Sequence, residues 1–366
     1  MDLEALRADI PACESCAFLN TGASGPSPRR VVEAVADAQR SHEFDVCSIG
    51  HYEAADELRE TARTALAGYL GCSPSDVALA ASTGDGISRV ANALDWAAGD
   101  RVVRTDLEHP SGVLPWRRLR DDGVEVETLA CPDGRLPMDD YHDAVVDAKL
   151  VCLSSESWLH GTRLPVREAV EIAHDAGAIV LIDAVQTVGQ HPIDVTEWGA
   201  DVVTASGHKW LLGPWGTGFL YVDPDTVSRF RPRHLGYRSA VDPTGDGLEF
   251  HPDARRFEVS TSALAPYAGV VEALELVDEI GIDTIERRIR RLTDRLKDGL
   301  GDRCLSPTEF ESGLVAIEVD DAETAVDQLA DDGVIVRDLP NGSLRASVHA
   351  FNTAEEIDTL LGSLPP

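Results

Sequence analysis

Lys209 is unusual in this sequence because of both its residue type and its surroundings. Only three of the 32 Lys and Arg residues are lysines, at positions 149, 209 and 297. Unlike arginine, a buried lysine can lose its proton and attack a carbonyl carbon to form an imine. Lys209 lies between the apolar segment 201–206 and a glycine-rich turn. It is therefore a candidate for Schiff-base chemistry. The plainer interpretation is a surface lysine at the end of a strand.

Two turns that follow apolar segments carry groups that could bind charge. Asp183 ends the apolar segment 178–184. A buried carboxylate there needs a cationic partner, unless it only caps the next turn. In the turn 82–86, hydroxyls and free backbone N–H groups precede a helical pattern, as they do in phosphate-binding sites. The plainer interpretation is that Thr83 or Asp85 caps this helix.

His109 and Arg345 each have a functional and a structural interpretation. His109 follows the segment 100–105 and could stack on a flat ring or transfer protons, although loop histidines are common. Arg345 lies in the segment 343–350 and could bind a carboxylate through two parallel hydrogen bonds, or form a salt bridge on an acidic surface. Together with Lys209, the acid and the phosphate turn, these residues make up the set that a pyridoxal phosphate site needs.

The segments that must position these groups alternate between strand-like and helical patterns. Helical patterns include residues 84–97 and residues 165–177, the latter with Gly177 as C-cap. This alternation predicts an α/β fold with a mostly parallel sheet, in which functional groups gather at the carboxyl ends of the strands. Seven short apolar segments are expected to form buried strands: residues 76–81, 100–105, 124–130, 148–155, 178–184, 201–206 and 218–223.

The pattern changes after about residue 235. Residues 260–300 are expected to form a long helix, a break at Gly281 and a second amphipathic helix, followed by an α+β region. The predicted organisation is an N-terminal segment that packs on the small domain, a large domain and a smaller α+β C-terminal domain. Their predicted ranges are residues 1–20, 21–245 and 246–366.

The charge of the chain restricts its possible partners. Of the 366 residues, 64 are acidic and 32 basic, so that the formal net charge is −32 at pH 7, while 43% of residues are hydrophobic. The hydrophobic content predicts a folded core rather than disorder. Dispersed acidic residues with few lysines indicate a surface adapted to high salt, which screens self-repulsion. Without a basic stripe, nucleic acid is not an expected partner.

The N-terminal residues and the cysteines bear on the location of the protein and on metal binding. The first residues, "MDLEALRADI", are charged, and no run of 18 apolar residues occurs, so that we expect a cytoplasmic protein with no membrane partner. The seven cysteines are odd in number and irregularly spaced. Cys13 and Cys16 have CxxC spacing but no second pair, and no metal site is predicted.

The quoted motifs together resemble fold-type-I pyridoxal-phosphate enzymes of the class-V aminotransferase group. This group includes cysteine desulfurases, selenocysteine lyases and isopenicillin-N-epimerase-like proteins. The resemblance extends from "FLNTGASGPSP" to "LRASVHAFNTAEEID". Its strongest pieces are Ser206-Gly207-His208-Lys209, Asp183-Ala184-Val185-Gln186, Glu108-His109 and the "STGDGI" turn.

The resemblance implies a role for each candidate residue. Lys209 would carry pyridoxal phosphate as a Schiff base and move the proton on the substrate Cα, and Asp183 would pair with the pyridine nitrogen. Gln186 would donate to the phenolic oxygen and His109 would stack on the ring. The substrate would be an amino acid, with Arg345 on its α-carboxylate and Asn20 nearby. The phosphate would be held by Thr83, Gly84, Ser206 and His208, and by Thr261 from a neighbouring subunit of a homodimer.

Three features of the sequence depart from the family pattern. Cysteine desulfurases carry a nucleophilic cysteine in a loop shortly before the carboxylate-binding arginine, whereas the segment 334–345, "VIVRDLPNGSLR", has none. Trp158 stands near the ring position, where relatives often have a small polar residue. Gly84 replaces a second threonine and leaves only a backbone amide.

The resemblance favours transamination of an α-amino acid. The alternatives are desulfurase-like or selenocysteine-lyase-like β-elimination, and epimerisation of an amino acid. A non-catalytic α/β binding protein is disfavoured by the presence of Lys209, Asp183 and His109. A nucleotide-binding enzyme is disfavoured because no phosphate-binding lysine or ribose-binding acid follows the turn 82–86.

Overall fold

A seven-stranded sheet forms the centre of the molecule. The computed structural model describes residues 1–365, apart from the side chains at positions 46 and 49. The strand order is β2-β8-β7-β6-β5-β3-β4, with β8 antiparallel to both of its neighbours and the other neighbouring pairs parallel. All seven predicted strands are present. They are β2 (Val77–Ala80), β3 (Arg101–Thr105), β4 (Glu125–Leu129), β5 (Ala148–Ser154), β6 (Ile179–Asp183), β7 (Val202–Ser206) and β8 (Gly218–Val222).

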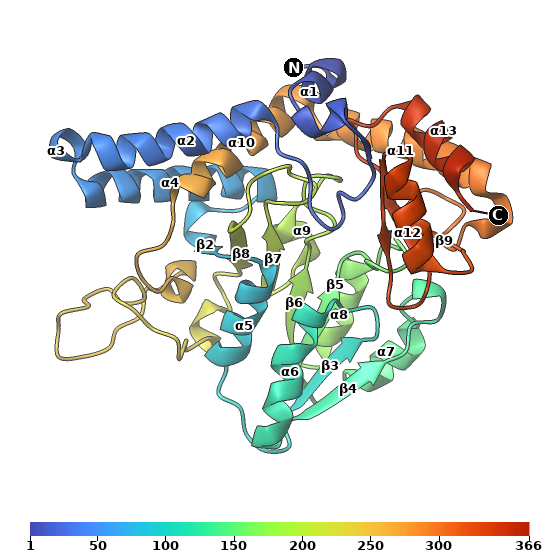
Figure 1. Ribbon diagram of the computed structural model, residues 1–366. Coiled ribbons are helices and arrows are strands. Elements are labelled where there is room, and N and C mark those ends of the chain that lie inside the picture. The colour runs from blue at the N-terminus through green and yellow to red at the C-terminus, as the bar shows by residue number, and fades with distance from the viewer. Residues whose placement is uncertain (366) are drawn as a thin grey trace.

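Apolar residues on both faces of this sheet explain why the strands are continuous hydrophobic runs. Every residue of β2, β6, β7 and β8 is buried, as expected for strands covered by helices on two sides. Figure 1 shows helices around the sheet, with α2, α4 and α10 side by side along one edge. The helices of this part are α2 (Arg29–Phe44), α3 (Val46–Ile49), α4 (His51–Leu70), α5 (Thr83–Ala93), α6 (Leu114–Leu119), α7 (Met138–Ala144), α8 (Val166–Asp175), α9 (Val195–Trp198) and α10 (Ala265–Ile280).

The C-terminal region forms a smaller α+β unit with its own apolar cluster. Its sheet has the order β11-β12-β9 and is antiparallel. The predicted break at Gly281 separates α10 from α11, and Gly281 has a left-handed φ of 84°. The elements are α11 (Ile282–Leu300), β9 (Leu314–Ile317), α12 (Ala322–Asp331), β10 (Val334–Ile335), β11 (Arg337–Asp338), β12 (Leu344–Ser347) and α13 (Ala354–Ser363).

The N-terminal segment contacts this smaller unit. Strand β1 (Ala17–Phe18) pairs in parallel with β10, while Leu6 and Ile10, in and just after α1 (Leu3–Ala8), pack with Phe351. Arg7 forms an ion pair with Glu356 at 2.8 Å. We therefore propose, as expected from the sequence, that residues 1–20 pack on the smaller unit.

The predicted domain boundary at residue 245 stays a prediction, and the packing of α10 favours a later one. Helix α10 packs on α2 and α4, and its buried residues Tyr267, Val270 and Leu274 belong to the same apolar cluster as one face of the large sheet. We therefore propose that the two units divide near Gly281. None of the described helices is long and apolar enough to cross a membrane.

Candidate active site

A cavity of about 210 Å³ lies at the carboxyl ends of the parallel strands, where the sequence predicted that the site would form. It collects groups from the ends of β2, β3, β5, β6 and β7 and from the hairpin of the smaller unit. Nine of the predicted residues line it: Thr83, Gly84, His109, Asp183, Gln186, Ser206, His208, Lys209 and Arg345. Asn20 and Thr261 are not among its lining residues.

Lys209 follows β7 and is the lysine whose amino group has no protein partner. Lys149 binds Asp100 at 2.6 Å, and Lys297 donates to the carbonyls of Pro307 and Glu309 at 2.7 and 2.8 Å. In the described part of the chain, the Lys209 amino group has neither a hydrogen bond nor an ion pair. Burial lowers the pKa of Lys209 to about 8, opposed by the negative charge of Asp183 and assisted by nearby arginines. A larger fraction of Lys209 is therefore neutral and nucleophilic near neutral pH.

Asp183 is the last residue of β6 and is 4% exposed. Its Oδ1 accepts the backbone N–H of Val185 at 2.9 Å, so that it does cap the following turn as the plainer interpretation predicted. Burial raises the pKa of Asp183 to about 6, while the Val185 hydrogen bond and Lys209 oppose the rise. At pH 7 this carboxylate is still about nine-tenths ionised, and it can hold a proton on a basic nitrogen placed against it.

Gln186 is held in place at both ends of its amide. Its Nε2 donates to the carbonyl of Gly22 at 3.1 Å, and its Oε1 accepts the indole N–H of Trp210 at 2.8 Å. One N–H of the Gln186 amide remains available to the cavity. Because Trp210 directly follows Lys209, this bond also fixes the turn that carries the lysine.

The phosphate turn is capped differently from the prediction. Ser82, rather than Thr83 or Asp85, is the N-cap of α5, and its Oγ accepts the Asp85 N–H at 3.1 Å. The backbone N–H of Thr83 donates to Ser206 Oγ at 2.7 Å, and the Thr83 hydroxyl forms a second hydrogen bond with the same oxygen, also at 2.7 Å. The result is a pair of hydroxyls at the N-terminus of an 11-residue helix, where an anion is favoured.

His109 and Trp158 form one wall of the cavity. Their rings meet edge to face with centroids 5.2 Å apart. The Nδ1 of His109 accepts the Ser111 N–H at 3.3 Å, which assigns the proton of the neutral ring to Nε2. Burial and the nearby cations Lys209, Arg337 and Arg345 lower the pKa of His109 to about 4, so that the ring is neutral at pH 7.

Arg345 is buried with an incomplete set of hydrogen bonds. It is 1% exposed, and one guanidinium nitrogen donates to the carbonyl of Trp158 at 3.0 Å, while Nε and Nη2 have no partner. Asn20 pairs with Ser347, two residues further along β12, and its buried Oδ1 also lacks a partner. Unsatisfied buried donors and acceptors of this kind are expected where a ligand supplies the missing partners.

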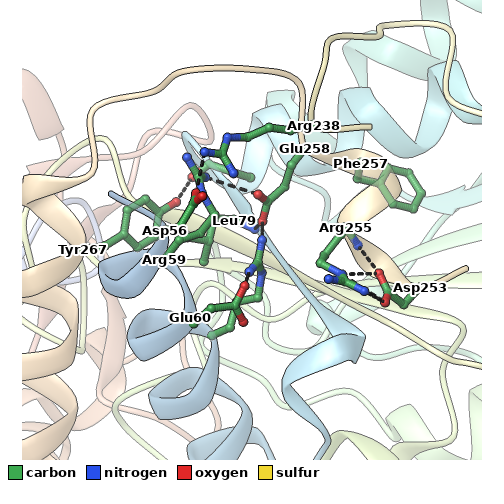
Figure 2. A network of polar contacts seen from close by, with 12 residues as sticks. Asp56, Arg59, Glu60, Leu79, Arg238, Asp253, Arg255, Phe257, Glu258 and Tyr267 are labelled. Carbon is green, nitrogen blue, oxygen red and sulfur yellow. Dashed lines mark hydrogen bonds and ion pairs between the residues drawn. The ribbon is translucent and has the colours of Figure 1, made fainter. Parts of the chain in front are cut away.

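Thr261 lies apart from these residues, beside α2 and α4. It lines a separate pocket with Arg59, Tyr237 and Arg238, and its hydroxyl is 3.1 Å from that of Tyr237. The segment before it is anchored by Glu258, which Figure 2 shows among the ion pairs of this region. Glu258 pairs with Arg59 at 3.2 Å and with Arg63 at 2.8 Å, and its Oε1 accepts the Leu79 N–H at 3.0 Å.

Several lining residues were not singled out from the sequence. Arg337 is the most informative, because it brings a second guanidinium into the cavity. The segment "VIVRDLPNGSLR" contains both arginines, but the register that places Arg337 opposite Arg345 was not visible in it. The other missed residues are Gly22, Ala23, Ser82, Ser111, Ser154, Glu156 and Val185.

Glu108 links the ends of two strands next to the cavity. It is 5% exposed, and its carboxylate accepts hydrogen bonds from the hydroxyls of Thr105 and Ser154 at 2.7 and 2.6 Å. Burial raises the pKa of Glu108 to about 7. The three side chains tie the ends of β3 and β5 together under His109.

The donor set fits a phosphorylated pyridine aldehyde. The cavity offers a partner-free lysine, a buried acid, a neutral histidine ring and paired hydroxyls at a helix N-terminus. A Cβ at position 84 would approach Ser111 Oγ to 3.2 Å, so that glycine keeps the turn open. Among residues 1–365, no group of three or more His, Cys, Asp or Glu side chains could hold a metal ion, and all seven cysteines are unpaired thiols.

Comparisons with known proteins agree with this set. The family model described as aminotransferase class-V matches residues 17–360. A protein named "probable cysteine desulfurase" from Methanothermobacter thermautotrophicus is 31% identical over 98% of this chain and 96% of its own length. The apo structure of a cysteine desulfurase from Thermococcus onnurineus has a TM-score of 0.90 and 27% identity, covering 98% of this chain and 96% of that one.

Two structures of another protein, C-DES, bear on the chemistry. One is described as the cystine C-S lyase C-DES in complex with its product cysteine persulfide, with a TM-score of 0.91, 26% identity and coverage of 98% of this chain and 100% of that one. The other is a C-DES mutant with glycine covalently linked to the PLP cofactor. With the matched family model and the cavity described above, these similarities show that the chain belongs to the class-V aminotransferase family of pyridoxal-phosphate-dependent enzymes.

Proposed function

We propose that this enzyme is a C–S lyase, which cleaves the Cβ–S bond of a cysteine-derived amino acid by β-elimination without transferring the sulfur to a cysteine of its own. The observation that carries the proposal is the hairpin before Arg345. In cysteine desulfurases, the nucleophilic cysteine belongs to a loop at this place in the sequence.

In this protein a tight turn replaces that loop. Strand β11 ends at Asp338 and β12 begins at Leu344. The turn is closed by hydrogen bonds from Leu339 N to Ser343 O at 2.8 Å and from Gly342 N to Leu339 O at 2.9 Å. No cysteine is among the described residues that line the cavity. A substrate sulfur in the cavity would therefore leave as a free thiolate, hydrosulfide or persulfide.

Three residues would perform the elimination. Arg345 binds the α-carboxylate through its unpaired Nε and Nη2, and Asp183 keeps a proton on the pyridine nitrogen. The bound cofactor supplies an electron sink for the charge that develops at Cα. Lys209, with its lowered pKa, would accept the Cα proton as a general base.

The electrons and atoms of this step balance without a redox partner. The electron pair of the Cα–H bond forms the Cα–Cβ double bond, and the pair of the Cβ–S bond leaves with the sulfur. Lys209 would pass the proton that it accepts from Cα to the departing sulfur. Hydrolysis of the resulting enamine with water yields pyruvate and ammonia.

The remaining cavity residues would hold the cofactor. Thr83, Gly84, Ser206 and His208 bind the phosphate; the backbone amide of Gly84 and the two hydroxyls donate hydrogen bonds. His109 stacks on the ring, and the free N–H of Gln186 donates to the phenolic oxygen. Asn20 does not line the cavity, but its bridge to Ser347 on β12 would place it near Arg345 at the substrate end.

Transamination was the first expectation from the sequence, and the relatives favour its alternative. The named relatives are cysteine desulfurases and a cystine C–S lyase, whereas none of those reported above is named an aminotransferase. None of the described cavity residues indicates binding of the oxo acid that transamination needs as a second substrate. Epimerisation has no support from these relatives either.

We further propose that the active unit is a homodimer with a shared site. Thr261 points into the pocket beside α2 and α4, not into the cavity of its own chain. The same region carries exposed aromatic side chains, with Phe44 78%, Tyr52 66% and Tyr237 42% exposed. A second copy packed on this region would cover these rings and bring its own Thr261 toward the phosphate turn.

Product analysis tests the proposed reaction. The cofactor-loaded protein is incubated in molar salt with L-cysteine and with L-cystine, and pyruvate, ammonia, alanine and sulfur products are quantified. A C–S lyase forms pyruvate and ammonia in equal amounts. Alanine as the main product would instead identify a desulfurase, and a sulfur-containing oxo acid without ammonia would identify a transaminase.

A further inference from the structure

Two arginines face the cavity, and neither has an acidic partner. Arg337 on β11 lies directly opposite Arg345 on β12 in the hairpin register. Arg337 Nε donates to the carbonyl of Asp338 at 3.2 Å, and its guanidinium carbon lies 5.8 Å from the centre of the Trp158 ring. Within the described residues, no carboxylate lies within 4.0 Å of either guanidinium.

This pairing is unusual for so acidic a chain. With 64 acidic residues, partners for arginine are abundant. The buried Arg59 and Arg63 share Glu258. Two adjacent cations without anions repel each other, and the buried Arg345 also loses its hydration, which is unfavourable unless a ligand compensates. The effect is visible at Arg345, because burial and the charge of Arg337 lower its pKa to about 9.

The ligands of the proposed reaction leave one arginine unused. In the proposed function, Thr83 and Ser206 bind the cofactor phosphate at the N-terminus of α5. Arg345 binds the α-carboxylate of the substrate. Arg337 therefore remains as a cation without an assigned anion. Its guanidinium lies over the Trp158 ring, and a planar, bidentate donor is best matched by a carboxylate.

We propose that Arg337 is a specificity-determining residue that binds a second carboxylate, carried on the side chain of the substrate. The inference rests on the proposed function and narrows its substrate to amino acids with a carboxylate at both ends, such as S-substituted cysteines whose sulfur bears a carboxylate-terminated group. Trp158 forms the flat wall along which this side chain lies, which accounts for a bulky residue near the ring.

Isosteric ligand pairs test this assignment by binding rather than turnover. The cofactor-loaded protein is titrated with L-aspartate and L-asparagine, and with L-glutamate and L-glutamine, and the visible band of the cofactor reports the dissociation constant. The members of each pair have nearly the same size and differ in the charge of the side chain. The wild-type protein is expected to bind the acidic member of at least one pair about tenfold more tightly or better.

Variants assign the preference to one residue. Arg337→Gln is expected to abolish the preference while leaving the affinity for asparagine and glutamine unchanged, which also shows that the site is intact. Arg287→Gln, on the exposed side of α11, removes the same charge elsewhere and is expected to keep the preference. Arg337→Lys retains the charge without the planar fork and is expected to give an intermediate preference.

The outcomes separate this inference from the proposed function. Equal binding of acidic and amide ligands to the wild-type protein would overturn the role of Arg337 and leave C–S lyase chemistry standing. A preference that survives in Arg337→Gln would also overturn it. If no amino acid altered the cofactor band, the proposed function would fail and this inference would fail with it.

Discussion

Lys209 and Asp183 line the same buried cavity, yet no ion pair within 4.0 Å joins them. The pKa of the lysine is lowered to about 8 and that of the acid is raised to about 6, chiefly by burial in both cases. A base and an acid held apart in this way leave room for a flat ring, with the lysine available to its aldehyde carbon and the acid to its nitrogen.

Cofactor loading is expected to depend on pH through Lys209. The neutral amine is the nucleophile, and with a pKa near 8 about 10% of it is neutral at pH 7, against about 0.03% for an ordinary lysine. The lowered pKa means that the neutral fraction rises between pH 7 and 9. Stopped-flow absorbance of the apoprotein mixed with pyridoxal phosphate should show a loading rate that increases over this range and levels off above it.

The variant Lys209→Ala provides the matching control. It is expected to show no covalent cofactor band and no turnover at any pH. Lys149→Ala should load normally because Lys149 is paired with Asp100 at the amino ends of β5 and β3, whereas the cavity lies at the carboxyl ends. A rate of loading that kept rising in proportion to hydroxide up to pH 10 would contradict the lowered pKa of Lys209.

Replacing Asp183 by asparagine is expected to separate cofactor binding from catalysis. The amide can still accept the Val185 N–H, so the fold and the loading should be preserved. Without the charged partner, the pyridine nitrogen loses its proton and the developing charge at Cα is less stabilised. We expect a loss of about 100-fold or more in the rate of exchange of the Cα proton with deuterium, followed by NMR. A near-normal exchange rate would remove Asp183 from the mechanism.

The buried Glu258 is expected to contribute strongly to stability. It is 3% exposed, as are Arg59 and Arg63, and the three side chains join α4 to the segment before Thr261. Glu258→Gln would leave the buried Arg59 without its paired carboxylate and Arg63 with only Glu60, whose side chain is 61% exposed. The expected cost is about 3 kcal/mol in the free energy of unfolding. Denaturant unfolding in molar salt measures it.

A matched variant distinguishes burial from charge alone. Asp56 pairs with Arg238 in the same network at 2.5 Å, but its side chain is 54% exposed. Asp56→Asn is therefore expected to cost less than about 1 kcal/mol. Equal losses for the two variants would show that burial does not govern this network (Figure 2).

The shared site can be tested by mixing two variants. Lys209→Ala cannot form the covalent link, and Thr261→Ala should bind the cofactor more weakly. If Thr261 acts across the dimer, a mixed dimer of the two variants contains one site with both native residues. Unfolding and refolding the mixture should then recover cofactor binding and activity at part of the sites. No recovery, or a monomeric mass by light scattering in high salt, would contradict the dimer proposal.

The charge of the chain predicts a requirement for salt. With a net charge of −32, dilute buffer removes the screening of self-repulsion. Dialysis from molar salt into dilute buffer is expected to reduce the helical signal in circular dichroism. An unchanged spectrum would refute the adaptation to salt.

The sequence predicted the large sheet well because its strands are buried on both faces. Each appears as a short apolar run bounded by turn residues. The acid ends such a run, and the histidine and the lysine follow theirs by a few residues. The order of types along the chain was enough to place Lys209, Asp183 and Thr83 at one edge.

What the sequence could not show depends on contacts between distant residues. Ser82 is the N-cap of α5, and Thr83 instead forms hydrogen bonds with Ser206, which lies more than a hundred positions away in the sequence. Arg337 enters the cavity through its register with Arg345. The packing of α10 on α2 and α4, which favours a domain boundary later than residue 245, was also not visible in the sequence.

The fate of the substrate sulfur tests the central claim most directly. The cofactor-loaded enzyme is mixed with cysteine for a single turnover and quenched with acid. Pyruvate and alanine are then quantified, and the mass of the intact protein is determined by mass spectrometry. We predict pyruvate in the amount of the active sites and no added sulfur atom on the protein. Alanine, together with one sulfur atom bound to a cysteine of the chain, would contradict elimination without a protein acceptor.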